Sequence, residues 1–315
     1  MLKKPLVVII VTNYNGASIT FKGKPILQLC LKSIIKSSYK KIKIIVADDK
    51  SFDKSKQLAN NFRTVEFIVN KKKRGFATNN NNAIKYAIKK YNPDYILLLN
   101  NDIIIKDRYW LNKLLKIAEK DNKIGIVSPK TIYPDGTLQY NGIYLKYGVM
   151  PRIRVWESQK RNKESEEIEI AGGAAMLIKR SVINKIGLLD ENFIMGLEDV
   201  DYSLRAREAG FNIIYYSETN IVHLEHYTTN HFPKKDAVKF KEEQFNYAYF
   251  SIKHFHNFKR FKSIFLNVIL RSFFEIGPNS GIKNVKLRHN ILFNLNISIK
   301  EISNAYKKYR SLKPR

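Results

Sequence analysis

The chain has 315 residues, of which 44% are hydrophobic, enough for one large folded domain or a domain with an appendage. Its only cysteine, Cys30, excludes a disulfide or a multi-cysteine zinc site within the chain and favours a reducing compartment. The formal net charge of +28 predicts a surface that attracts polyanions, such as nucleic acid, an anionic membrane or a phosphorylated substrate. No apolar run reaches the ~20 residues that a membrane span requires.

The first 128 residues alternate between strand-like and helix-like segments. Buried strands are expected over residues 6–11, 42–47, 65–69, 95–99 and 124–128. Amphipathic helices are expected over residues 25–37, 54–62, 77–91 and 110–121. The run 6–11 follows two lysines, as in a signal peptide, but it is too short and no small-residue cleavage site follows it. The alternation predicts an α/β fold in which helices cover both faces of a parallel sheet.

Polar residues stand directly after each of the first four predicted strands. They occupy positions 12–16, 48–49, 70–75 and 100–102. In parallel sheets, ligands bind beyond the carboxyl ends of the strands. We therefore expect these four segments to form a single site along one edge of the sheet.

The second half of the chain has a different pattern. Residues 133–136, Tyr-Pro-Asp-Gly, predict a hairpin tip, and the charged segment 157–169 predicts a loop. Residues 170–178 are small and then apolar, which is typical where the backbone closely approaches a ligand or another element. A helix is expected over 197–210 and a strand over 211–216, followed from residue 234 by helices alone. We expect one domain over residues 1–232, divided near residue 128, and a helical extension over 233–315.

Seven motifs follow one another along the chain: VTNYNG, IIVADDKSFDKS, KRGFATNNNNAI, LLLNNDI, GGAAMLIKR, GLLDENFIMGLEDVDYSLRAREAGF and IVHLEH. Their order resembles the family 2 glycosyltransferases, and the triplet Asn-Asn-Asp resembles the rhamnosyltransferase-like subgroup. The resemblance covers about residues 5–230. It implies a GT-A fold with a mixed sheet, a UDP- or dTDP-sugar donor, a Mg²⁺ or Mn²⁺ ion and inversion at the anomeric carbon. Residues 1–128 would bind the nucleotide, and residues 129–232 the acceptor.

Glycosyl transfer from a nucleotide sugar leaves negative charge on the departing diphosphate, which a metal or cations must offset. The resemblance assigns Asp102 and His223 to the metal, and a carboxylate oxygen is a suitable ligand for Mg²⁺ or Mn²⁺. From position alone, Asp102 also fits a turn or a helix cap, and His223 fits a structural histidine. The family often has a first carboxylate where this chain has Asn100, which brings no charge.

The attacking acceptor hydroxyl must also lose a proton to a base. Glu198, Asp199 and Asp201 fall in the first turn of a predicted helix, where the helix dipole favours acids whatever the function. The resemblance assigns the base to Asp199, which we expect the dipole and nearby cations to keep ionised. Glu198, Asp201 and Gly173 are expected to support this site or the acceptor. Asp201 can also pair with Arg205 one turn further on.

The resemblance places Asp48 against the ring N3–H of the donor base, which selects uracil or thymine over cytosine. A turn residue is the alternative interpretation of Asp48, and Asp53 is expected to cap the following helix. Lys73 and Arg74 could reach the diphosphate. The expected donor-binding residues lie along the predicted sheet edge and are Thr12, Tyr14, Asn15, Asp48, Arg74, Gly75, Asn79, Asn100, Asn101 and Asp102.

The basic, aromatic-rich helices after residue 233 have two open interpretations, docking on the first domain or lying on an anionic membrane. RNA binding is not expected, because no recognition motif is present. We expect an inverting glycosyltransferase that adds a sugar such as rhamnose to a glycan or lipid-linked acceptor. Its expected location is the cytoplasm, with the inner face of the cell membrane as the alternative. One rival is a nucleotidyltransferase of similar fold, although the glycine-rich loop typical of those enzymes is missing. The other is a basic membrane- or nucleic-acid-binding protein with a relict site.

Overall fold

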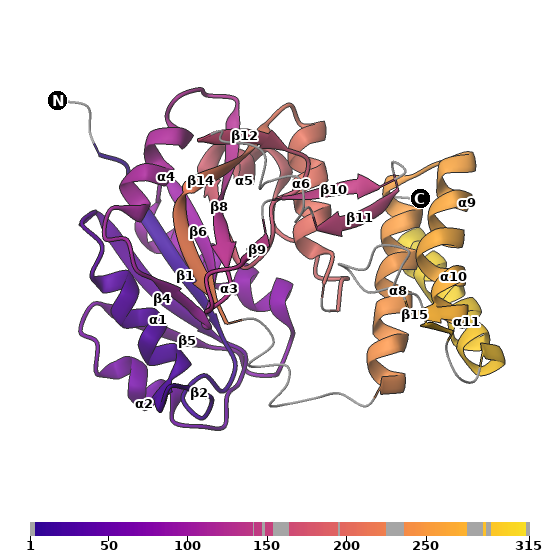
Figure 1. The fold of residues 1–315 in the computed structure, drawn as a ribbon, viewed down its shortest axis with the longest axis horizontal. Helices are drawn as coiled ribbons and strands as arrows, with labels where there is room; N and C mark the ends of the chain where they lie inside the picture. Colours follow the sequence, from indigo (N-terminus) through magenta and orange to yellow (C-terminus); the bar gives the residue numbers. More distant parts are fainter. Residues whose placement is uncertain are drawn as a thin grey trace.

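The computed structural model describes residues 4–140, 142–146, 149–153, 164–194, 196–224, 236–275, 286–287 and 291–312. A mixed sheet with helices on both faces forms one part of the protein, and the helices of the C-terminal region stand beside it (Figure 1). Along the main sheet the strands are ordered β5-β4-β1-β6-β13-β8-β14-β12.

Four parallel strands form one half of the sheet: β1 (Val7–Asn13), β4 (Ile42–Asp48), β5 (Val65–Val69) and β6 (Tyr95–Asn100). The other half is mixed: β8 (Ile124–Ile132), β12 (Ser165–Ile168), β13 (Ala175–Lys179) and β14 (Asn212–His223). Two short strands pair with β14 and β8, respectively: β7 (Ile103–Ile105) and β9 (Leu138–Tyr140). Two ribbons of the first domain are separate from the main sheet: β2 (Thr20–Phe21) with β3 (Lys24–Pro25), and β10 (Ile143–Lys146) with β11 (Met150–Ile153).

Helices pack on both faces of the sheet. One face is covered by α1 (Ile26–Ile35), α2 (Ser55–Asn60) and α4 (Trp110–Ala118). The other is covered by α3 (Phe76–Tyr91), α5 (Arg180–Ile186) and α6 (Glu198–Glu208). Val7 and Ile9 of β1 face the first layer, and Val8 and Ile10 face the second. Since both faces of β1 are buried, an unbroken apolar run replaces the alternation of a half-exposed strand.

All nine elements expected in the first 128 residues are present, with ends that differ by a few residues. The expected hairpin is also present, between β8 and β9. β13 was not expected: it lies between β6 and β8 and runs antiparallel to both, so the five strands of this part do not form one continuous parallel sheet. The loop expected over 157–169 is wrong in its last part, where β12 pairs with β14; residues 157–163 lie outside the described chain.

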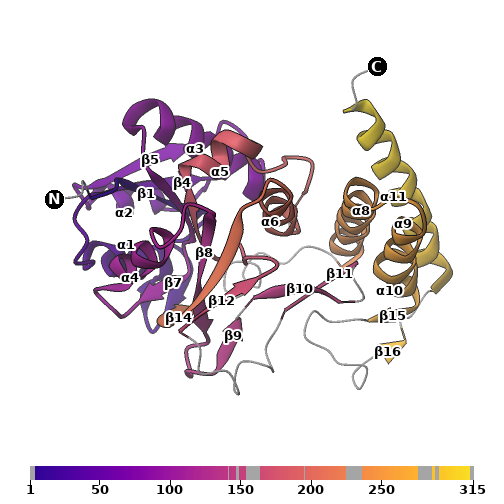
Figure 2. The same ribbon diagram turned by 90° about the horizontal axis from the view of Figure 1, so that it is seen from above.

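The C-terminal region consists of α8 (Asp236–His254), α9 (Asn257–Ile264), the π-helical turn η2 (Phe265–Ile269), α10 (Leu270–Phe273) and α11 (Ile291–Ser311). It differs from the all-helical expectation by a small ribbon of β15 (Phe274–Glu275) and β16 (Lys286–Leu287). Val200 and Leu204 of α6 share a buried cluster with Tyr249 and Phe250 of α8, so this region docks on the first domain (Figure 2). The expected boundary at residue 232 falls in a segment that is not described. Among the described residues, no helix combines the length and apolarity needed to cross a bilayer.

Candidate functional site

The ends of β1, β4 and β6 are joined by buried polar side chains. Asn13 Nδ2 donates to Asp48 Oδ2 at 2.7 Å, and Asn101 Nδ2 donates to Asn13 Oδ1 at 2.7 Å. The Ser51 hydroxyl donates to Asp48 Oδ2 at 2.6 Å, and the Ser51 N–H donates to Oδ1 at 2.8 Å. A Cβ on Gly16 would lie 2.4 Å from Asn13 Oδ1, so only glycine fits here. These strand ends share one edge as expected, and Asn13, which was not among the candidates, connects them.

A second buried network surrounds Asp49 and joins β4, β5 and the start of α3. Asp49 Oδ1 accepts from Asn70 Nδ2 at 3.0 Å and from the Arg74 N–H at 2.8 Å, and Oδ2 accepts from the Gly75 N–H at 2.9 Å. Asn79 is 2% exposed; it donates to the main chain of β4 and accepts from Asn70. The side chain of Asn79 therefore helps to hold the sheet edge together, and its contact with a donor stays a prediction.

Aromatic and basic side chains lie on the outer side of this edge. Lys73 Nζ is 3.8 Å from the centroid of the Tyr14 ring, and the Phe52 ring meets Tyr14 edge-on at 6.2 Å. Phe52, which is 73% exposed, was not among the candidates. The Arg74 side chain is exposed. A pair of rings with a lysine beside one of them can take up a flat, anionic ligand such as a nucleotide.

Three other predicted donor contacts belong to side chains that are bound within the protein. Thr12 Oγ1 donates to Asn80 Oδ1 at 2.9 Å, and Asn15 Oδ1 accepts from the Phe52 N–H at 2.9 Å. The Nδ2 atom of Asn15 is buried without a hydrogen-bond partner among the described residues. Asp48 is 1% exposed and holds the turn at Ser51. Asp48 therefore acts as a turn residue in the structure. The contacts of Thr12, Asn15 and Asp48 with a donor stay predictions.

Asp102, which follows β6, lies next to His223, the last residue of β14. His223 Nε2 is 3.3 Å from Asp102 Oδ1, a buried atom that has no hydrogen-bond partner among the described residues. His223 Nδ1 is 2.8 Å from Gln139 Oε1. Because a carbonyl oxygen only accepts, the neutral ring carries its proton on Nδ1 and turns the lone pair of Nε2 toward Asp102.

An imidazole lone pair and a carboxylate oxygen that face each other fit a divalent cation, and Gln139 orients the imidazole as an outer partner would. The buried, unpartnered Oδ1 of Asp102 is the atom such an ion would satisfy. No cluster of three or more His, Cys, Asp or Glu side chains suited to a metal occurs in the part of the chain that the structure describes. The described residues therefore offer two ligands, Asp102 and His223, and a bound molecule could supply others.

Asp199 lies in the first turn of α6 and faces the backbone of Gly173. The Gly173 N–H donates to Asp199 Oδ2 at 2.7 Å, and a Cβ on Gly173 would lie 3.2 Å from that oxygen. The carbonyl of the next residue, Ala174, accepts from the Asn100 N–H at 3.0 Å. Asp199 therefore stands beside the same end of β6 that carries Asp102.

The two neighbouring acids of α6 both have raised pKa values. Burial, followed by the charge of Asp199, raises the pKa of Glu198 to about 8. Burial also raises the pKa of Asp199, although hydrogen bonds from the Gly173 and Val200 N–H groups oppose the rise. We expected the helix dipole and nearby cations to keep Asp199 ionised. The part given to cations is wrong, because burial raises the pKa of Asp199 by more than the backbone hydrogen bonds lower it. With a pKa raised to about 8, Glu198 is mostly protonated at neutral pH.

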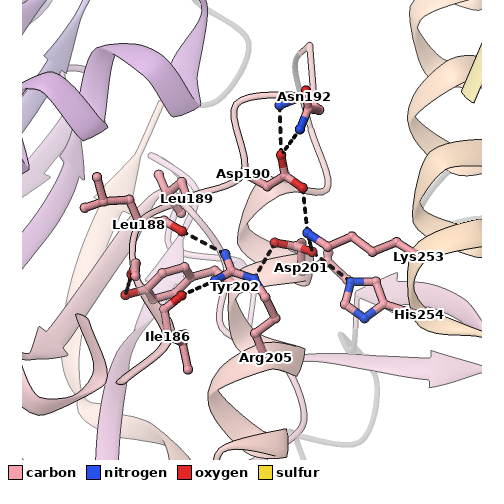
Figure 3. A network of polar contacts seen from close by, with 12 residues as sticks. Ile186, Leu188, Leu189, Asp190, Asn192, Asp201, Tyr202, Arg205, Lys253 and His254 are labelled. Carbon is pink, nitrogen blue, oxygen red and sulfur yellow. Dashed lines mark hydrogen bonds and ion pairs between the residues drawn. The ribbon is translucent and has the colours of Figure 1, made fainter. Parts of the chain in front are cut away.

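Asp201 is fully buried and joins α6 to α8 (Figure 3). Its Oδ2 accepts from Arg205 Nε at 2.9 Å, the pair expected from the sequence, while Oδ1 lies 2.6 Å from Lys253 Nζ and 2.8 Å from His254 Nε2. Burial alone would raise the pKa of Asp201, but the hydrogen bond with His254 and the cations of Arg205 and Lys253 hold the pKa well below its usual range. Lys253 Nζ also lies 2.5 Å from Asp190 Oδ2. Asp201 thus has a structural role, which fastens the C-terminal region to α6.

Gln139, Lys253 and His254 were not among the candidates. Gln139 is 84 residues from His223, and His254 is 53 residues from Asp201. Such separations produce no spacing pattern, and one lysine is not distinctive in a lysine-rich chain. Asp190, Asp201 and Arg205 all stand within one quoted motif, GLLDENFIMGLEDVDYSLRAREAGF, whereas Lys253 and His254 lie outside every quoted motif.

Known proteins match this chain over most of its first domain. The family model described as "Glycosyl transferase family 2" matches residues 8–187, more than half of the chain. The chain is 29% identical over 237 residues to the rhamnosyltransferase WbbL of Escherichia coli K12, covering 71% of this chain and 88% of that protein. It is 23% identical over 242 residues to the N-acetylglucosaminyl-diphospho-decaprenol L-rhamnosyltransferase of Mycobacterium tuberculosis, covering 69% and 77%.

Two further relatives extend well beyond the matched part. The O-antigen biosynthesis protein RfbC of Myxococcus xanthus is 24% identical over 148 residues, which are 44% of this chain and 12% of that protein. The hexosyltransferase Agl10 of Haloferax volcanii is 26% identical over 194 residues, covering 57% of this chain and 59% of that protein. The chain thus spans less than two thirds of the length of these two proteins.

Two solved structures resemble the fold. GalNAc-T7 with UDP, GalNAc and Mn²⁺ has a TM-score of 0.56 and 16% identity, covering 70% of this chain and 43% of that one. The mannosyltransferase PcManGT of Pyrobaculum calidifontis with GDP-Man and Mn²⁺ has a TM-score of 0.54 and 15% identity, covering 97% and 76%. At these identities the likeness concerns the fold alone, and it confirms the expected GT-A fold.

Proposed function

Because the chain belongs to glycosyl transferase family 2 and is a glycosyltransferase of GT-A fold, we propose that it moves a sugar from a UDP- or dTDP-sugar to a glycan or lipid-linked acceptor, with inversion. One observation carries the proposal: Asp102, His223 and Asp199 gather around the end of β6 through three contacts. These are the approach of His223 to Asp102, the bond between Asn100 and Ala174, and the bond between Gly173 and Asp199.

Asp199 is the proposed base. The acceptor hydroxyl oxygen forms a bond to the anomeric carbon while the bond from that carbon to the diphosphate oxygen breaks, and the hydroxyl proton passes to a carboxylate oxygen of Asp199. A pKa raised by burial supports this role, because a base works best when its pKa approaches the working pH. The Gly173 N–H fixes the direction of the carboxylate. Protonated Glu198 keeps the negative charge of the pair on Asp199.

We assign a Mg²⁺ or Mn²⁺ ion to Asp102 and His223, with Gln139 orienting the imidazole. When bound, the ion would offset the negative charge that gathers on the leaving diphosphate. Two protein ligands suit such an ion, since it commonly completes its coordination with phosphate oxygens and water. The two GT-A structures that contain Mn²⁺ support a divalent cation.

The donor nucleotide is proposed to lie along the edge formed by β1, β4 and β6. Asp48 Oδ1 accepts the Ser51 N–H, and a carboxylate oxygen can accept a second hydrogen bond, here from the N3–H of uracil or thymine. Tyr14, Phe52 and Lys73 supply rings and a cation beside it. The names of two relatives, a rhamnosyltransferase and a diphospho-decaprenol rhamnosyltransferase, support rhamnose as the sugar and a lipid-linked acceptor. We propose a cytoplasmic site of action.

The test uses Asp199→Asn and a matched control, Asp135→Asn, at an exposed hairpin tip. Each protein is screened with UDP- and dTDP-sugars for donor binding by calorimetry and for nucleotide release, with and without Mn²⁺. We expect D199N to bind the donor like the parent and to lose about 10²- to 10⁴-fold in transfer, while D135N keeps both. Transfer that survives in D199N would refute the assignment of the base. If the affinity for the donor is the same with and without Mn²⁺ and is unchanged in Asp102→Ala, the metal site is refuted.

A further inference from the structure

The outer side of α9 and η2 carries a stripe of exposed phenylalanines. Phe258, Phe261 and Phe265 are 74%, 66% and 43% exposed, and their spacing of three and four residues puts them on one side of the helix. The rings of Phe261 and Phe265 stack with centroids 6.3 Å apart. We call Phe258, Phe261 and Phe265 the phenylalanine stripe. An ordinary amphipathic helix turns such side chains inward, so their outward position calls for a partner surface.

The opposite side of the same helical segment is fixed to the protein. Ser263 Oγ lies 2.7 Å from Ser251 Oγ of α8, and Asn267 Nδ2 donates to the Val149 carbonyl at 2.9 Å. Both Ser263 and Asn267 are fully buried. The orientation of the stripe is therefore set by packing and hydrogen bonds, and its exposure is a stable property of the fold.

The surroundings of the stripe are basic. Residues 257–265, which carry the stripe, contain Lys259, Arg260 and Lys262 and no acidic residue. The Lys259 side chain is exposed and that of Lys262 is partly exposed. From residue 231 to the C-terminus the sequence has 18 basic and 5 acidic residues, a net charge of +13 in a chain of +28.

We propose that the phenylalanine stripe and Lys259 and Lys262 form a docking surface for an anionic lipid bilayer. The rings would enter the boundary between head groups and acyl chains, and the lysines would contact lipid phosphates. A second copy of this chain fits less well, because it would bring another +28 charge against the same basic surface. A nucleic acid fits less well too, since proteins that stack bases on aromatic rings hold the strand in a groove, whereas this stripe lies on the outer side of a helix.

Docking through this surface leaves the rest of the molecule free. α8 packs on α6 through Asp201 and His254, while α9, which carries Phe258 and Phe261, lies on the far side of α8 from α6 (Figure 2). The sequence left two interpretations of these helices open, docking on the first domain or lying on a membrane. The structure shows the first, and our proposal assigns the second to the outer side of α9 and η2. The binding of lipid can be measured without donor or acceptor, so a failure here would leave the proposed glycosyl transfer untouched.

The experiment measures co-sedimentation of the full chain with vesicles of phosphatidylglycerol and phosphatidylcholine, and with vesicles of phosphatidylcholine alone. We expect binding to the anionic vesicles only, weakened by salt. The triple variant F258S/F261S/F265S is expected to bind at least about tenfold more weakly, because it loses the apolar contact. K259Q/K262Q should also bind roughly tenfold more weakly, whereas K116Q/K120Q, which removes the same charge from exposed positions of the other domain, should bind like the parent.

Unchanged thermal midpoints would show that these surface variants fold. The proposal is overturned if the parent does not bind anionic vesicles, or if the phenylalanine variant binds as well as the parent. It is also overturned if K116Q/K120Q weakens binding as much as K259Q/K262Q, since net charge alone would then explain the attraction. A dimer in sedimentation velocity that disappears in the phenylalanine variant, without vesicle binding by the parent, would assign the stripe to a second copy instead.

Discussion

Lys253 Nζ of α8 lies 2.6 Å from Asp201 Oδ1 of α6, two residues beyond the proposed base Asp199. Asp201 is fully buried, and the side chain of Lys253 is 20% exposed. Lys253 also reaches Asp190, so one cation bridges two acids of the first domain. The C-terminal region is thereby part of the support of the site.

Replacement of Lys253 by Met should weaken this support. The change leaves Asp190 and Asp201 without their shared cation, and we expect it to lower the free energy of unfolding by about 1–3 kcal/mol. It should lower kcat more than it raises KM for the donor, because α6 carries Asp199 whereas the donor lies along the strand ends. Chemical denaturation and initial rates measure the two effects. Lys239→Met, at an exposed position of the same helix, is the control and should change neither.

Replacement of Gln139 by Leu should weaken metal binding. The leucine removes the acceptor that fixes the tautomer and orientation of His223, and we expect the Mn²⁺ concentration for half-maximal activity to rise about 10- to 100-fold. Gln57→Leu, at an exposed position of α2, controls for the change in side-chain type. A Mn²⁺ requirement that Q139L leaves unchanged would argue against His223 as a ligand.

Replacement of Gly173 by Ala should displace the proposed base. The new methyl group would lie 3.2 Å from Asp199 Oδ2, so the carboxylate must move by a few tenths of an ångström. We expect kcat to fall by about tenfold, since misplaced catalytic groups lose much of their effect, with donor affinity unchanged. Stopped assays at saturating donor give kcat, and calorimetry gives the affinity. A loss of donor affinity instead would place Gly173 at the donor rather than at the base.

Glu198 should make stability depend on pH. Its pKa of about 8 in the folded protein lies above that of an unfolded glutamate, about 4.3, so the folded state keeps a proton that the unfolded chain loses. The contribution of Glu198 to the free energy of unfolding is therefore largest below about pH 4, and it falls as the pH rises toward about 8. Glu198→Gln cannot titrate and should lose less stability over this range, by on the order of a few kcal/mol. Parallel pH curves for parent and variant in denaturant titrations would contradict the raised pKa.

Much of the first domain could be predicted from local patterns. Leu97 to Leu99 in the middle of β6 are apolar because helices cover both faces of the sheet. The strand could therefore be predicted from its unbroken apolar run. The same logic led from strand ends to the polar edge that Asn13, Asp48 and Asn101 now share. The order of β13 between β6 and β8 was not predictable in this way, because antiparallel insertion depends on contacts between segments about 50 to 80 residues apart.

The sequence by itself determined the strands, the helices and the kinds of residue at their ends, because periodicity and turn chemistry act over a few residues. Only the tertiary structure decided which of those residues meet. It placed His223 beside Asp102 with Gln139 behind it, and it set the partly buried Asp199 next to Gly173, so that desolvation and not a cation governs the pKa of Asp199. Besides Arg205 of its own helix, Asp201 is held by Lys253 and His254, which lie 52 and 53 residues further along the chain. Such pairing depends on distance in space, which the order of residues does not record.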